Sequence, residues 1–227
     1  KKNKKNKKNK KNKKNKKNSK KNSKIKKKIS EYKKIIDSKN KSYNVYSVSN
    51  EDSNKFKKGD YPSTYGYLTE KGLARIITEI KIFKNDKNYI KNKNFIDLGS
   101  GDGKLVIYSL AYPFKKSYGV ELAEERHNFA ESLKSKLSES DKKRINFYNG
   151  DLLKQDVSDI DIIYISSLCF NTEFLKKIAL KLEKELKKGV MIFTSSELNS
   201  NKLKFIKNFN AEQSWDKNSN IYMYEKI

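Results

Sequence analysis

The amino-acid sequence predicts an α/β domain built on a seven-stranded, mostly parallel β-sheet. Three observations lead to this prediction. Residues 94–104 read as a short apolar strand, a glycine-rich turn and the start of a helix. From there to residue 194, short apolar runs alternate with amphipathic helical segments, a pattern typical of parallel sheets. The last two apolar runs are joined by a polar turn at 216–219, which predicts an antiparallel pair.

The stretch Asn94–Lys104 reads Asn-Phe-Ile-Asp-Leu-Gly-Ser-Gly-Asp-Gly-Lys and organises the predicted domain. Asp97 lies at the carboxyl end of the strand. Three glycines follow at alternate positions: Gly99, Gly101 and Gly103. They let the backbone turn tightly and approach a ligand, and ligands of open α/β sheets bind at this crevice. Because Lys104 stands where a dinucleotide site has its third small residue, the pattern favours S-adenosylmethionine, whose cationic amino group suits Asp97.

Charge and composition indicate the class of protein and the compartment to expect. The chain has 227 residues and a net charge of +26. Residues 1–28 hold 18 lysines and no acid, which leaves 35 basic and 27 acidic residues for the rest. The single cysteine excludes an internal disulfide and suits a reducing compartment, and no apolar run is long enough to span a membrane. We therefore expect a soluble, intracellular monomer that has no membrane partner.

The N-terminal part divides into two predicted regions. Residues 1–24 repeat Lys-Lys-Asn with almost no apolar side chain, so we expect a disordered basic tail that binds nucleic acid through its lysines. Drift of an A/T-rich codon repeat is the alternative explanation of this run. Residues 25–90 read as a helical and extended lid region. Apolar residues at helical spacing predict a helix over 25–39, and the polar residues 42–60 read as a loop.

The end of the lid region leads into the domain. Residues 61–68 read as an extended segment that turns at Gly66, and Thr69 is expected to cap a helix. The apolar stripe of that helix is predicted from Leu73, Ile76, Ile77, Ile80 and Phe83.

After the glycine-rich turn, predicted helices and strands alternate to the end of the chain. The strands are expected at 117–122, 144–148, 161–167, 190–194, 203–214 and 220–226. The helices are expected over 105–111, around 129–137 and around 174–186. Residues 91–227 thus read as one S-adenosylmethionine-binding domain with the class I methyltransferase architecture, a Rossmann-like sheet closed by a C-terminal hairpin.

Two further acids complete the predicted cofactor site. Glu121 lies 18 residues beyond Gly103 at the end of the second strand, where a carboxylate can accept both ribose hydroxyls of an adenosine. Asp151 follows Gly150 after the third strand, where an acid can accept the exocyclic amine of adenine. Together with Asp97 and the glycines, these acids predict an S-adenosylmethionine site. Nothing in the sequence predicts a metal site.

The segment after the fourth strand normally lines the substrate channel of such a domain. Methyl transfer needs alignment of the nucleophile, the methyl group and sulfur, together with the exclusion of water. Here the segment is Ser166-Ser167-Leu168-Cys169-Phe170. It lacks the Asn/Asp-Pro-Pro-aromatic sequence of enzymes that methylate amino groups of nucleic acids. Cys169 lacks the preceding proline of cytosine-C5 enzymes, and we expect it to be a small buried residue.

Several motifs, taken together, resemble those of one known family. They are Tyr65-Gly66, Phe95–Lys104, Tyr118–Glu121, Gly150-Asp151-Leu152, Ser166–Phe170, Val190–Ser196, and Ser214-Trp215 with Tyr222. Over residues 61–227 the chain resembles the catalytic domain of the non-SET histone H3 lysine methyltransferases, the disruptor-of-telomeric-silencing family.

The resemblance implies both a site and a substrate. It implies cofactor contacts from Tyr65, Gly66, Ser100, Lys104 and Leu152 as well as from the residues above. It implies a lysine channel walled by Ser166, Ser167, Phe170, Trp215 and Tyr222. The implied substrate is histone H3 on nucleosomes, with a role in chromatin regulation in the nucleus. A lysine-rich segment that holds nucleosomal DNA also recurs in the family.

Some positions depart from the family's pattern. Tyr67 replaces a glutamate, Ser166 and Ser167 replace asparagines, and Leu152 and Leu168 each replace a phenylalanine. These changes bear on the channel and the substrate more than on the cofactor fold, so methylation of another basic protein stays open. Two further alternatives are a methyltransferase that acts on RNA or DNA, and a non-catalytic nucleic-acid-binding module.

Overall fold

The structure is a computed structural model that describes residues 22–39, 44, 49–55 and 66–227. Residues 1–21 of the predicted tail lie outside the described residues, as do residues 61–65 of the extended segment, including Tyr65.

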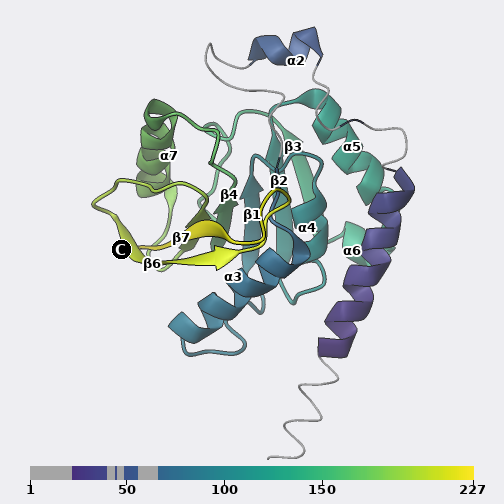
Figure 1. Ribbon diagram of the computed structural model, residues 1–227, viewed down its shortest axis with the longest axis horizontal. Helices are drawn as coiled ribbons and strands as arrows, with labels where there is room; N and C mark the ends of the chain where they lie inside the picture. The colour runs from purple at the N-terminus through teal and green to yellow at the C-terminus, as the bar shows by residue number, and fades with distance from the viewer. Residues whose placement is uncertain (1–21, 40–43, 45–48, 56–65) are drawn as a thin grey trace, which may run out of the picture.

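A seven-stranded sheet forms the centre of the fold (Figure 1). Its strands are β1 Asn94–Leu98, β2 Lys116–Glu121, β3 Ile145–Asn149, β4 Ile162–Ile165, β5 Met191–Thr194, β6 Leu203–Ala211 and β7 Ser219–Lys226. Their order across the sheet is β3-β2-β1-β4-β5-β7-β6. The pairings among β1 to β5 are parallel, whereas β7 runs antiparallel to both β5 and β6. The predicted parallel sheet with an antiparallel C-terminal pair is confirmed.

Helices cover both faces of the sheet (Figure 1). The longer ones are α3 Glu70–Phe83, α5 Glu124–Lys134 and α7 Thr172–Glu185; the shorter ones are α2 Asn50–Lys55, α4 Lys104–Ser109 and α6 Glu139–Lys142. Because successive side chains of a strand point to opposite faces, Phe95 of β1 packs in the apolar cluster with α3, α4 and α5, and Ile96 packs in the cluster with α7. Among the described helices, none combines the length and the apolar character needed to cross a membrane.

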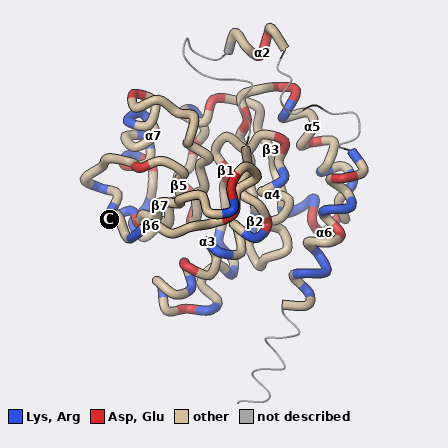
Figure 2. The backbone as a smooth tube through the Cα atoms, viewed as in Figure 1, with Lys and Arg blue, Asp and Glu red and all other residues tan. Residues whose placement is uncertain are grey.

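A helix over residues 22–39 packs beside α5 and α6 (Figure 1). Its described part starts at residue 22, so the helix includes residues before the predicted start at residue 25. Tyr32 and Ile36 from its apolar stripe are buried. The Tyr32 hydroxyl donates to Asp141 Oδ2 at 2.9 Å, and Lys28 Nζ reaches Asp141 Oδ1 at the same distance. Figure 2 shows the blue of lysines along this helix. The exposed ones are Lys24, Lys26, Lys27, Lys33 and Lys34.

Helix α2 corrects the prediction that residues 42–60 form a loop. The Ser49 hydroxyl accepts the backbone N–H of Asp52 at 3.0 Å, and Glu51 and Asp52 place negative charge in the first turn. A run rich in Ser, Asn and Asp resembles a loop because these side chains compete for backbone hydrogen bonds. In this segment the same side-chain chemistry starts a helix. Figure 1 shows α2 above the start of α5.

Helix α3 follows its prediction except at its last residue. Thr69 caps it by accepting the Gly72 N–H at 3.2 Å. Four residues of the predicted stripe are buried: Leu73, Ile76, Ile77 and Ile80. Phe83, at the end of the helix, is 37% exposed.

Candidate active site

The glycine-rich turn lies between β1 and α4, in the middle of the parallel strands. Gly99, Gly101 and Gly103 have φ angles of +87°, +54° and +76°, in the left-handed region that favours glycine. At Gly103 a Cβ would also lie 2.6 Å from the Phe147 ring. At Gly99 a Cβ would meet nothing within 4 Å, so the backbone there is open to a ligand. The N–H groups of Gly99 and Ser100 hold the turn by donating to the Val120 carbonyl at 2.8 and 2.9 Å.

Asp97 is a buried carboxylate at the end of β1. Its exposed fraction is 3%, and its Oδ1 has no hydrogen-bond partner among the described residues. Burial raises its pKa well above the usual range, and the negative charges of Glu121 and Asp102 raise that pKa further. Buried polar atoms in proteins are nearly always paired. A cationic ligand group at Oδ1 would supply the partner and the compensating charge.

Glu121 joins the glycine-rich turn to the start of α5. Its Oε2 accepts the Gly101 N–H at 2.8 Å, and its Oε1 accepts the Ala123 N–H at 2.9 Å. Burial raises the pKa of this carboxyl, whereas the Ala123 N–H, the Arg126 charge and the Gly101 N–H lower it. Each oxygen keeps further acceptor capacity, so the ribose contact predicted for Glu121 is chemically available.

Lys104 connects Tyr67, in the segment before α3, with Asp102 of the glycine-rich turn. Its Nζ lies 2.7 Å from Asp102 Oδ2, in an ion pair whose side chains are 10% and 1% exposed. The same Nζ lies 5.0 Å from the centroid of the Tyr67 ring. Burial raises the pKa of Tyr67, and the Lys104 charge lowers it. Tyr67 therefore contacts the cation at the end of the glycine-rich turn.

Asp151 and Leu152 follow β3, in a turn beside Glu121. Asp151 Oδ1 accepts the Leu153 N–H at 2.8 Å, and Leu152 is buried in the apolar cluster with α7. The Asn149 side-chain amide donates to the Glu121 carbonyl at 3.0 Å, and the N–H of the next residue, Gly150, donates to the same carbonyl at 2.9 Å. Asn149 was not predicted to belong to the site, because an asparagine before a Gly-Asp turn is typical of an ordinary loop.

Ser166 and Trp215, both predicted for the substrate channel, meet at Gly66. The Ser166 hydroxyl donates to the Gly66 carbonyl at 3.4 Å. A Cβ on Gly66 would lie 2.0 Å from the Trp215 ring, so only glycine fits beneath that ring. The Ser214 N–H donates to the Tyr67 carbonyl at 2.9 Å. The segment before α3 is thus paired with the connection between β6 and β7.

The other predicted channel residues are placed differently. Ser167 is fully buried, and its hydroxyl accepts the Ser196 N–H at 2.9 Å. Phe170 and Tyr222 are partly buried against the α7 cluster. The structure therefore joins Ser166, Gly66 and Trp215, while Phe170 and Tyr222 lie on the α7 side of the sheet.

Cys169 is exposed, so the prediction of a small buried residue was wrong. The Phe170 N–H donates to the Ser167 carbonyl at 3.0 Å, so the chain turns sharply after β4. This turn also leaves the neighbouring Leu168 57% exposed.

A buried polar network that was not predicted lies next to Asp97. The Tyr164 hydroxyl donates to Gln213 Oε1 at 3.0 Å, and the Ser195 hydroxyl donates to the same oxygen at 3.3 Å. Tyr164 lies opposite Asp97 in the pairing of β4 with β1. Burial raises the pKa of Tyr164, and the Asp97 charge raises it further. A tyrosine on β4 and a glutamine in the connection between β6 and β7 carry no spacing signal, so only the structure reveals the network.

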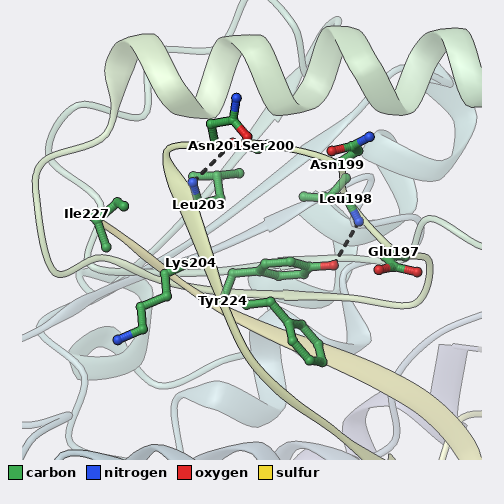
Figure 3. A pocket seen from close by; sticks show the side chains of 10 residues that line it. Glu197, Leu198, Asn199, Ser200, Asn201, Leu203, Lys204, Tyr224 and Ile227 are labelled. Carbon is green, nitrogen blue, oxygen red and sulfur yellow. Dashed lines mark hydrogen bonds between the residues drawn. The ribbon is translucent and has the colours of Figure 1, made fainter.

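A separate hollow of about 730 Å³ lies between the loop over residues 197–201, the start of β6 and the end of β7 (Figure 3). Tyr224 forms part of its wall, and its hydroxyl accepts the Leu198 N–H at 2.8 Å. The residues that line it include neither Glu121 nor the glycine-rich turn, so it is separate from the candidate cofactor site. Within the described part of the chain, no three His, Cys, Asp or Glu residues gather as they would around a metal ion.

Comparisons with known sequences agree with this geometry. Residues 97–196 match the family model of the ANTKMT methyltransferase domain. The chain is also 33% identical over 163 residues to a histone-lysine N-methyltransferase, H3 lysine-79 specific, from Caenorhabditis elegans. That match covers 66% of this chain and 16% of the nematode protein, so the chain spans a small part of that relative's length.

Solved structures with similar folds are also methyltransferases. A putative methyltransferase from Escherichia coli is 13% identical, with a TM-score of 0.52 over 67% of this chain and 86% of that one. Magnesium protoporphyrin IX methyltransferase from Synechocystis, with S-adenosylmethionine bound, is 12% identical, with a TM-score of 0.52 over 69% and 80%. A putative methylase from Haemophilus influenzae is 17% identical, with a TM-score of 0.52 over 68% and 90%. This chain therefore has the fold of the class I S-adenosylmethionine-dependent methyltransferases.

Proposed function

We propose that this chain is an S-adenosylmethionine-dependent methyltransferase that acts on lysine side chains of a basic protein, with histone H3 on nucleosomes as the first candidate. The observation that carries the cofactor assignment is the buried Asp97 carboxylate with its unpartnered Oδ1. A buried acceptor next to glycine backbone suits a ligand with a cationic amino group. When bound, S-adenosylmethionine supplies an electrophilic methyl group on its sulfonium.

The chain's own residues then have separate tasks. Asp97 binds the amino group, Glu121 accepts the ribose hydroxyls, and Asp151 accepts the adenine amine. The left-handed glycines let the backbone lie against the cofactor. Because the sulfonium already carries a good leaving group, the protein's contribution is alignment and the exclusion of water.

The substrate assignment rests on other observations. The relative from Caenorhabditis elegans acts, by its name, on lysine 79 of histone H3. A substrate lysine has an ordinary pKa of about 10.4 and must lose its proton before it attacks. Apolar surroundings disfavour the ammonium form. Trp215 and Ser166 both contact Gly66, and the next residue, Tyr67, lies against Lys104 at the end of the glycine-rich turn, so Trp215 gives this part of the chain an aromatic wall. We assign this wall to the lysine channel.

The lysine-rich N-terminal segment is proposed to hold nucleic acid beside the substrate, which would place the protein in the nucleus. Its 18 lysines within residues 1–28 support this role. Exposed lysines of the helix over 22–39 continue the same charge along the chain. If about 6–10 lysines contact phosphates, affinity falls roughly 10³–10⁵-fold between 50 and 200 mM salt.

The test is transfer of a labelled methyl group from S-adenosylmethionine to nucleosomes, free histones, DNA or RNA. We expect label on histone H3 in nucleosomes, lost when the lysines of residues 1–21 are replaced by glutamine. The same lysine-to-glutamine variant should label free histones as well as the unchanged chain does, because residues 66–227, which hold the candidate site, are unchanged. Label on DNA or RNA would favour the nucleic-acid alternative. Cofactor binding without label on any of the four would contradict the substrate assignment.

A further inference from the structure

Helix α5 starts next to the ribose-binding position without a capping side chain of its own. Its N-cap residue is Ala123, which makes no side-chain cap hydrogen bond. The first N–H groups of a helix have no partner within the helix and need one from outside. The first turn of α5 therefore depends on an acceptor from another element.

Asp52 in α2 supplies that acceptor. Its Oδ2 accepts the backbone N–H of Glu125 at 3.2 Å, although 73 residues separate the two in the sequence. The Asp52 side chain is 2% exposed, while its neighbour Glu51 on the same helix is exposed. A carboxylate at the N-terminus of a helix is also favoured by the helix dipole. Figure 1 agrees with this contact, because it shows α2 above the start of α5.

The turn that Asp52 caps carries two partners of Glu121. The Ala123 N–H donates to Glu121 Oε1 at 2.9 Å. The buried Arg126 contributes a positive charge that lowers the pKa of Glu121. Both residues lie within the first turn or at its cap. Displacement of this turn would therefore displace the groups that hold the ribose-binding carboxylate.

We propose that Asp52 is a positioning residue for S-adenosylmethionine binding: it caps α5 from α2 and so fixes the partners of Glu121. This inference rests on the proposed function, because it assumes that Glu121 binds the ribose. It assigns α2 to the cofactor site, although the sequence of this segment resembles a polar loop.

The test is calorimetric titration of S-adenosylmethionine into the full chain and three variants. We expect Asp52→Ala to weaken cofactor binding about fivefold, the size of effect that the loss of one cap produces. Asp52→Asn keeps an acceptor oxygen and should stay within about twofold of the unchanged chain. Glu51→Ala removes an exposed carboxylate from the same turn and should have no effect. The thermal unfolding midpoint of each variant is measured first, and all titrations are run at a temperature well below the lowest midpoint, so that every variant is folded.

A double-mutant cycle shows whether Asp52 acts through Glu121. In a Glu121→Gln background, Asp52→Ala should weaken binding by less than about twofold; another fivefold loss would overturn the proposal. A lower unfolding midpoint with unchanged affinity in Asp52→Ala, as a purely structural role predicts, would also overturn it. If the unchanged chain binds no S-adenosylmethionine, the proposed function fails instead.

Amide hydrogen exchange in the unchanged chain provides a measurement that needs no variant. Bound S-adenosylmethionine should slow exchange of the Glu125 N–H, because it holds Glu121 and with it the first turn of α5. Exchange at Glu125 that is the same with and without bound cofactor would overturn the proposal.

Discussion

The two halves of the candidate site are built from different chemical groups. At the ends of β1 and β2, the cofactor half holds the buried carboxylates of Asp97 and Glu121 beside left-handed glycines, and Glu121 accepts two backbone N–H groups. The half proposed for the substrate holds short hydroxyls at the ends of β4 and β5 and the 43% exposed Trp215 from the connection between β6 and β7. Backbone geometry thus determines the first half, and side chains from distant segments form the second. Substitutions in the first half should therefore change cofactor binding, and substitutions in the second half should change substrate binding.

The largest effect is expected at Gly103, where both the backbone and the space require glycine. Gly103→Ala combines a left-handed φ of +76° with a Cβ 2.6 Å from Phe147, and should cost about 2–4 kcal/mol of unfolding free energy. Gly99→Ala is the matched control, because its Cβ would meet nothing within 4 Å, and it should cost about 1–2 kcal/mol. Urea unfolding measures both. Equal losses would mean that the contact with Phe147 is unimportant.

The next effect tests the cofactor half directly. Glu121→Ala should weaken S-adenosylmethionine binding at least about tenfold with the fold intact, since it removes two charge-assisted acceptors. As a control, Glu131→Ala removes a half-buried carboxylate of α5 that pairs with Lys134 at 3.2 Å, and it should leave cofactor affinity unchanged. Calorimetry and circular dichroism together measure affinity and fold. Unchanged affinity in Glu121→Ala would refute the ribose assignment.

In the substrate half, Trp215→Ala should raise the KM for the protein substrate about fivefold. An exposed aromatic wall contributes to substrate binding and does not touch the buried carboxylates. The cofactor dissociation constant should therefore stay within about twofold. Initial rates at varied substrate and cofactor concentrations separate the two constants. If Trp215→Ala weakened cofactor binding as much as it raised the substrate KM, the two halves of the site would not be independent.

A smaller effect is expected in the pH dependence of stability. The pKa of Asp97 is raised in the folded chain, so the folded state keeps a proton that the unfolded state releases near pH 4. The free energy of unfolding without cofactor should then fall as pH rises from about 4 through the folded-state pKa. Asp97→Asn should remove most of this fall and leave a remainder from Glu121, whose pKa is also raised. Identical pH profiles for the two chains would contradict the assigned environment of Asp97.

The sequence predicted the cofactor half better than the substrate half for physical reasons. A strand, a turn of alternate glycines and an acid at the next strand end are local patterns, and β-sheet topology brings their ends together. The contacts of Ser166 with Gly66, and of Gly66 with Trp215, join segments about 100 and 150 residues apart in the chain. No periodic pattern predicts such contacts. The Asp52 cap was missed for the same reason, because its partner lies 73 residues away.

Calorimetric titration of S-adenosylmethionine into the unchanged chain and into Asp97→Asn tests the central claim most directly. Loss of a buried carboxylate that pairs with a cationic ligand should cost about 2–5 kcal/mol, or at least thirtyfold in affinity. We predict that the unchanged chain binds the cofactor and that Asp97→Asn binds it at least about thirtyfold more weakly while its thermal midpoint is equal or higher. Equal affinity in the two chains, or no binding by the unchanged chain, would contradict the account.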